Sequence, residues 1–125
     1  MSEQHVFIGI PCGRASLDVD QSVSLTDTIV TFVEAGLKRP ERRIFHGNCY
    51  VHFCRNMLAH EFFWKTNCTH LFFWDDDVAA PPGALRRLLS YDRDIIVAPY
   101  PKKLPAGTPP QEAWPYAMTN GIPDE

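Results

Sequence analysis

The sequence lacks the features that would assign the chain to a membrane, to the secretory pathway or to nucleic acid. No apolar run approaches the roughly 20 residues that a membrane-spanning helix needs, so we expect no membrane span. The first residues show no basic segment followed by an apolar one, so no secretory signal is visible and we expect a cytoplasmic protein. The formal net charge is only -3, and this mild, mixed charge gives no reason to expect nucleic acid as a partner.

Cysteine is scarce, and its spacing excludes two common structural roles. The four cysteines are Cys12, Cys49, Cys54 and Cys68. They match neither a paired C-x-x-C zinc site nor a dense disulfide framework, so we expect reduced, partly buried thiols. Histidine offers no zinc pattern either, because His52 and His60 are eight residues apart and not at the i, i+4 spacing of a paired helical site.

What the sequence does contain is a regular series of short apolar segments. The chain has 125 residues, of which 45% are hydrophobic, enough for one domain with a core. Apolar, β-branched segments predict strands at 6–10, 71–74 and 94–98, and a weaker candidate lies at 43–46. A basic group of Lys38, Arg39, Arg42 and Arg43 is interpreted as a solvated turn.

Helical periodicity fills the gaps between these strands. A first helix is predicted from Ser24 or Thr26, both good N-cap residues, to about Gly36. Its predicted apolar face consists of Leu25, Ile29, Val33 and Leu37. A second helix is predicted over 51–65, and a third over 84–89 after two prolines. The apolar stripe of the second helix consists of Val51, Cys54, Leu58 and Phe62.

The order of these elements predicts the fold class. Strands that alternate with helices favour an α/β fold, here a Rossmann-like, doubly wound and mostly parallel sheet. Seven prolines fall after residue 98, where regular structure is not expected. We therefore predict an α/β domain over 1–103 and a proline-rich loop or tail over 104–125.

Three consecutive carboxylates, Asp75, Asp76 and Asp77, follow the apolar strand predicted at 71–74. They cannot continue into the core unpaired, because burying an isolated carboxylate is costly, so the strand end should open into a crevice. Ligands of open α/β sheets bind outside the carboxyl ends of the strands. Strand alternation would place Asp75 and Asp77 on one side of the strand and Asp76 on the other. Asp75 and Asp77 could then share one Mg²⁺ or Mn²⁺ ion. An alternative is an acidic cluster that only complements the dipole of the following helix.

Several segments together resemble one enzyme family. The segment 72–77, Phe-Phe-Trp-Asp-Asp-Asp, resembles the Asp-x-Asp motif of GT-A-fold glycosyltransferases. The segment 47–59, with Arg55 and Asn56, looks like the Ala-Arg-Asn helix that precedes this motif. The segment 8–11 resembles the nucleotide-binding first strand and loop, and 94–102 is similar to the strand after the motif in bacterial and phage members. The resemblance covers about residues 6–103.

The resemblance implies a nucleotide-diphospho-sugar donor, bound across the strand ends and transferred to an unknown acceptor. It implies that Asp77 binds Mn²⁺ or Mg²⁺ and that Asp75, with Asp76 beside it, contacts the ribose or the metal shell. Pro11, Cys12 and Gly13 would line the base and ribose. Arg55 would approach the phosphates, a role that suits its permanent charge and paired donors, and the alternative is a surface Arg55 paired with Asp75 or Asp76.

The early end of the chain leaves other functions open. Family members are longer, so we expect a donor-binding half without a visible general base, and no catalytic residue is assigned. Asp124 and Glu125, in the proline-rich tail, are poor candidates for that base. Two alternatives are a non-catalytic nucleotide- or metal-binding module and a haloacid-dehalogenase-type phosphohydrolase with Asp75 as nucleophile. An exposed sheet edge would also favour a homo-oligomer.

Overall fold

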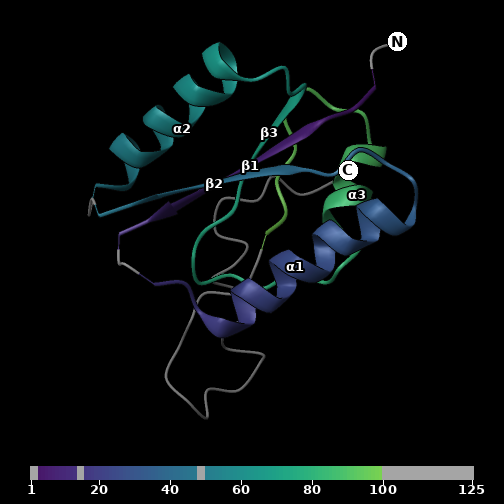
Figure 1. The fold of residues 1–125 in the computed structure, drawn as a ribbon, viewed down its shortest axis with the longest axis horizontal. Coiled ribbons are helices and arrows are strands. Elements are labelled where there is room, and N and C mark those ends of the chain that lie inside the picture. Colours follow the sequence, from purple (N-terminus) through teal and green to yellow (C-terminus); the bar gives the residue numbers. More distant parts are fainter. Residues whose placement is uncertain (1–2, 14–15, 48–49, 100–125) are drawn as a thin grey trace, which may run out of the picture. The chain divides into compact units, whose positions relative to one another are not determined.

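The computed structural model describes residues 3–13, 16–47 and 50–99, and Figure 1 shows their fold. The chain divides into two compact units between Arg87 and Leu88. The proline-rich segment, and with it Lys102, Lys103 and Trp114, lies outside the described residues. Everything that follows on the sheet and on the candidate sites concerns the first unit.

A parallel sheet forms the centre of this unit, as predicted for an α/β chain. Its strands are β1 (Val6–Cys12), β2 (Glu41–His46) and β3 (His70–Phe73), in the order β2-β1-β3. Phe7 is in register with Glu41 on one side and with Leu71 on the other. All seven residues of β1 are buried, which is why this strand is apolar along its whole length.

Helix α2 (Val51–Lys65) has the predicted bounds and packs on the sheet. Of the predicted stripe, Cys54 and Leu58 are fully buried and Phe62 is half-buried, whereas Val51 in the first turn is exposed. A Cβ atom at Gly9 would lie 3.4 Å from Leu58, so the absence of a side chain at Gly9 allows the helix to approach β1 closely. The Phe7 and Phe62 rings complete this contact, with centroids 5.9 Å apart.

Helix α1 (Val19–Glu34) begins five residues before the predicted Ser24, with Asp18 as its N-cap. Ser24 is not a cap, because its hydroxyl donates to the Ala80 carbonyl at 2.6 Å and accepts from the Ala80 N–H at 2.8 Å. The predicted apolar face was only partly right, because Leu25 is buried and Ile29 is half-buried. Val33 and Leu37 are exposed. The buried residues are Gln21, Ser24, Leu25, Thr28 and Phe32. Figure 1 shows α1 and α2 on opposite sides of the sheet.

Strand β1 extends through Pro11 and Cys12, which were predicted to leave the strand as a loop. Proline is tolerated here because β3 pairs with β1 only as far as Gly9 and Phe73. Among the strands that the structure describes, β2 is therefore the one ladder neighbour of β1 at Pro11, through Phe45. A missing N–H is compatible with such an edge position.

The predicted strand at 94–98 is wrong. Helix α3 (Ala84–Ser90) agrees with its prediction, but residues 91–99, the described part of the chain after it, form no strand. Ile95 and Val97 are 86% and 76% exposed. β-branched residues favour extended backbone, but strand formation depends on a paired neighbour, so propensity alone was insufficient. Among the described residues, no helix is both long and apolar enough to cross a membrane.

Candidate functional site

The carboxyl edge of the sheet brings together the segments that follow β1 and β3. The Trp74 N–H donates to the Gly9 carbonyl at 2.9 Å, which continues the β3 contact one residue beyond the strand. Further on, the Asp18 N–H donates to the Asp76 carbonyl at 3.1 Å. The loop that leads into α1 is therefore joined to the acidic triplet, as expected for parallel strands whose carboxyl ends share one edge.

The acidic triplet lies in a turn rather than on the strand. Trp74 is 5% exposed, and its indole N–H donates to the Val78 carbonyl at 2.6 Å. The Val78 N–H lies 3.4 Å from the Asp75 carbonyl, so residues 75–78 form a turn held by backbone. All three aspartates are half-buried. The prediction that Asp75 and Asp77 point to one side assumed that both lie on a strand. This assumption is wrong, because β3 ends at Phe73.

Arg55 lies beside this turn, where its guanidinium donates to the Asp75 carboxylate at 3.1 Å. The same guanidinium is 5.9 Å from the centre of the Phe73 ring. The structure thus contains the Arg55–Asp75 pair that was the alternative to phosphate binding. The two side chains are 43% and 31% exposed, so water screens the pair and its net stabilisation is at most about 1 kcal/mol. Because the pair is weak, Arg55 can leave it to bind an anion, or Asp75 can leave it to bind a cation.

The three residues predicted to line a base and ribose differ in accessibility. Pro11 and Cys12 are buried within β1, and only Gly13 is exposed. The Cys12 thiol donates to the Ser16 carbonyl at 3.3 Å. Direct contact of Pro11 with a ligand is not supported by this burial, and Gly13 is the member of the three that offers accessible backbone.

A basic pocket adjoins Cys12 at the same edge. It has a volume of about 460 Å³, and Arg42, Arg43 and His46 are among its lining residues. The sequence interpretation missed it, because these arginines were taken as part of a solvated turn, whereas both lie on β2. Arg43 also pairs with Glu61 at 2.8 Å. Adjacent residues of a strand point to opposite faces of the sheet, and Arg43 is held by Glu61 of α2, so Arg42 is the arginine that suits this pocket to an anionic group such as a phosphate.

A second cluster lies at the opposite, amino edge of the sheet, and sequence analysis did not anticipate it. His5, Glu41 and Cys68 place one potential ligand atom each within 4.8 Å of the other two. Burial raises the pKa of the Cys68 thiol above its ordinary value, and Glu41 raises it further, whereas Thr66 and Lys38 lower it. No spacing motif joins these residues. The signal that could have found them is their position, since each lies at or just before the start of a strand.

Comparison with known proteins gives no indication of function, so function is inferred from the residues at the carboxyl and amino edges of the sheet. No family model matched the chain, and neither a curated protein nor a solved structure matched it.

Proposed function

We propose that this chain binds a nucleotide-diphospho-sugar at the carboxyl edge of its sheet and forms the donor-binding part of a metal-dependent glycosyltransferase. The observation that carries the proposal is the hydrogen bond from Asp18 to Asp76, which joins the segment after β1 to the acidic turn after β3. Helices on opposite sides of a parallel sheet also support a doubly wound, GT-A-like arrangement. The acceptor is not assigned. A cytoplasmic location and self-association through the sheet edges belong to the same proposal.

The acidic turn offers a donor set that fits Mn²⁺ or Mg²⁺. Carboxylate oxygens are the hard ligands that these ions prefer, and Mg²⁺ commonly uses only one or two protein carboxylates together with substrate phosphates. Asp77 and Asp75 are the residues we expect to hold the ion. Once bound, such an ion acts as a Lewis acid that neutralises charge on the departing diphosphate.

The remaining side chains of this edge would position the donor. Arg55 pairs only weakly with Asp75, so its guanidinium is available to a diphosphate when Asp75 turns to the metal. The basic pocket, with Arg42 among its lining residues, offers a further site for anionic groups. Gly13 is exposed beside this pocket's Cys12 and can contact a ligand through its backbone.

Titration of the full chain with UDP- and GDP-sugars, with and without Mn²⁺, tests the proposal. We expect metal-dependent binding that weakens at least about tenfold in Asp77→Ala, with the fold intact by circular dichroism. Asp27→Ala is the matched control, because Asp27 is exposed on α1. Unchanged metal-dependent binding in Asp77→Ala would contradict the site assignment.

An activity assay on the same protein separates the competing functions. Transfer or hydrolysis of the sugar supports the glycosyltransferase. Donor binding without turnover would favour a non-catalytic binding module. A trapped aspartyl-phosphate on Asp75 would favour the phosphohydrolase and overturn the proposal.

A further inference from the structure

We propose that His5, Glu41 and Cys68 form a binding site for Zn²⁺, or a divalent ion of similar ligand preference, at the amino edge of the sheet. This site is at the other end of the strands from Asp75, Asp76 and Asp77. It therefore does not depend on the nucleotide-sugar proposal.

The distances within this cluster match those between ligands of one zinc ion. The Cys68 sulfur lies 3.7 Å from His5 Nδ1 and 3.4 Å from Glu41 Oε2. Typical Zn–S and Zn–N or Zn–O bond lengths, at a tetrahedral angle, separate sulfur from either ligand atom by about 3.6 Å. All three ligand atoms lie within 4.8 Å of one another, so small side-chain adjustments would complete the geometry.

The fold holds the three residues in place through backbone contacts. The His5 N–H donates to the Thr69 hydroxyl at 2.8 Å, and the His5 carbonyl accepts from the Thr69 N–H at 2.7 Å. Thr69 follows Cys68 directly, so these bonds fix the spacing of two ligands. Glu41 begins β2 and is in register with Phe7 of β1. Each ligand thus stands at the amino end of a different strand of one sheet.

The chemistry of the ligands selects zinc over the ions expected at the acidic turn. A thiolate and an imidazole favour Zn²⁺, whereas Mg²⁺ and Mn²⁺ favour oxygen ligands alone. Cys68 donates its S–H to Glu41 in the metal-free protein. A bound ion would take the place of this proton, which is released to the solvent, and one thiolate with one carboxylate would balance its charge.

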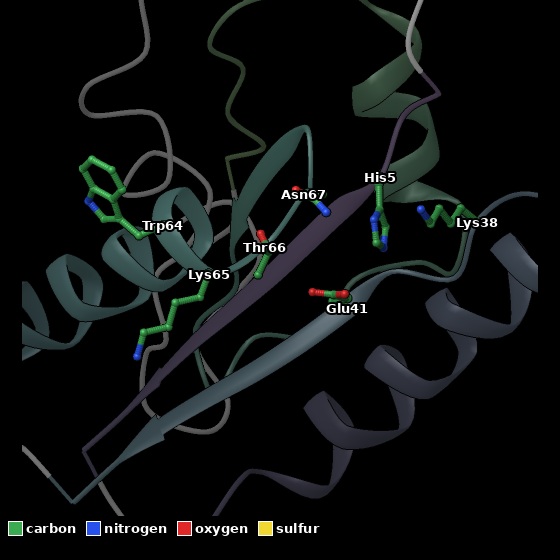
Figure 2. A pocket seen from close by; sticks show the side chains of 7 residues that line it. All are labelled: His5, Lys38, Glu41, Trp64, Lys65, Thr66 and Asn67. Carbon is green, nitrogen blue, oxygen red and sulfur yellow. The ribbon is translucent and has the colours of Figure 1, made fainter.

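A pocket of about 450 Å³ adjoins the cluster and gives the ion access to solvent. His5 and Glu41 both line it, and Figure 2 shows the His5 ring pointing toward Glu41, with the Lys38 ammonium group directed toward His5. Three protein ligands with an open fourth position are typical of zinc sites that bind water or a substrate group. The positive charge of Lys38 favours an anionic group, such as hydroxide or a carboxylate, at that position.

Metal titration of the full chain tests this site. Protein stripped with a chelator should bind one equivalent of Zn²⁺ by calorimetry. The same protein should bind Co²⁺ with the near-ultraviolet absorption of a thiolate–cobalt bond. We expect Cys68→Ser and His5→Gln to weaken Zn²⁺ binding by at least about tenfold, the lower limit reported for the loss of outer-shell partners.

Matched controls remove the same groups elsewhere. Cys12→Ser removes a thiol at the opposite edge, and His60→Gln removes an exposed imidazole on α2, so both should bind Zn²⁺ as the unmodified chain does. If Cys68→Ser fails to fold, the cobalt spectrum of the unmodified chain shows whether a cysteine thiolate binds the metal. Absence of the thiolate band, or equal Zn²⁺ affinity in all variants, would overturn the proposal.

Discussion

The guanidinium of Arg55 and the carboxylate of Asp75 lie 3.1 Å apart and join the first half of α2 to the turn after β3. Both side chains remain partly exposed, so this pair is accessible to a ligand from solution. Because one partner suits a phosphate and the other suits a cation, the pair represents the unliganded state of the proposed donor site.

Removing Arg55 should affect donor binding much more than the stability of the fold. We expect Arg55→Ala to weaken binding of UDP- or GDP-sugars by about tenfold or more, while the free energy of unfolding falls by at most about 1 kcal/mol. Calorimetry and urea denaturation measure the two effects. Arg86→Ala, at an exposed position of α3, should change neither. A large loss of stability with normal donor binding would show that the pair is structural.

Leu58 should be essential for the contact between α2 and the sheet. Its side chain is fully buried and faces Gly9, so Leu58→Ala leaves a cavity and should cost about 2–5 kcal/mol of unfolding free energy. Urea denaturation followed by circular dichroism measures this loss. Met57→Ala is the control, because Met57 is 40% exposed on the same helix and should cost much less. Equal losses in the two variants would contradict the packing of α2 described above.

Gln21 offers a stabilising substitution. It is fully buried, and within the described residues neither atom of its side-chain amide has a hydrogen-bond partner. Gln21→Met keeps much of the volume without the buried amide, and should raise the unfolding free energy by about 1 kcal/mol. Thermal denaturation detects this gain, and Gln4→Met, at an exposed position, should have little effect. A marked loss of stability would mean that the amide has a partner.

Ser24 should stabilise the segment between β3 and α3. Its hydroxyl makes two hydrogen bonds with the backbone of the half-buried Ala80, so Ser24→Ala removes the partner of that N–H and carbonyl and should cost about 1–3 kcal/mol. Hydrogen exchange at the Ala80 amide should accelerate in this variant. Ser22→Ala, two residues earlier on the same helix, should leave that exchange unchanged.

The sequence was most informative where one physical requirement dominated. Helix α2 has its predicted bounds because its buried positions, Cys54 and Leu58, recur at helical spacing. The parallel sheet followed from the alternation of elements. The acidic triplet was correctly expected at a strand end, although the strand stops at Phe73.

Prediction failed where the outcome depended on partners distant in the sequence. Ser24 looked like a helix cap, but Ala80 provides its hydrogen bonds 56 residues away. The segment 94–98 has strand propensity without a paired strand. His5, Glu41 and Cys68 become neighbours only when three strands align, so no local pattern could indicate them.

The central position of β1 has a consequence for how the chain folds during synthesis. This strand is made before its two partners, since Phe7 pairs with Glu41 and Leu71, and His5 is joined to Thr69 across 64 residues. This apolar strand can therefore complete its pairing only after the residues of β3 have been synthesised. Closing such long loops is slow, so we expect this unit to fold more slowly than a helical bundle of equal length and to benefit from chaperones that cover β1.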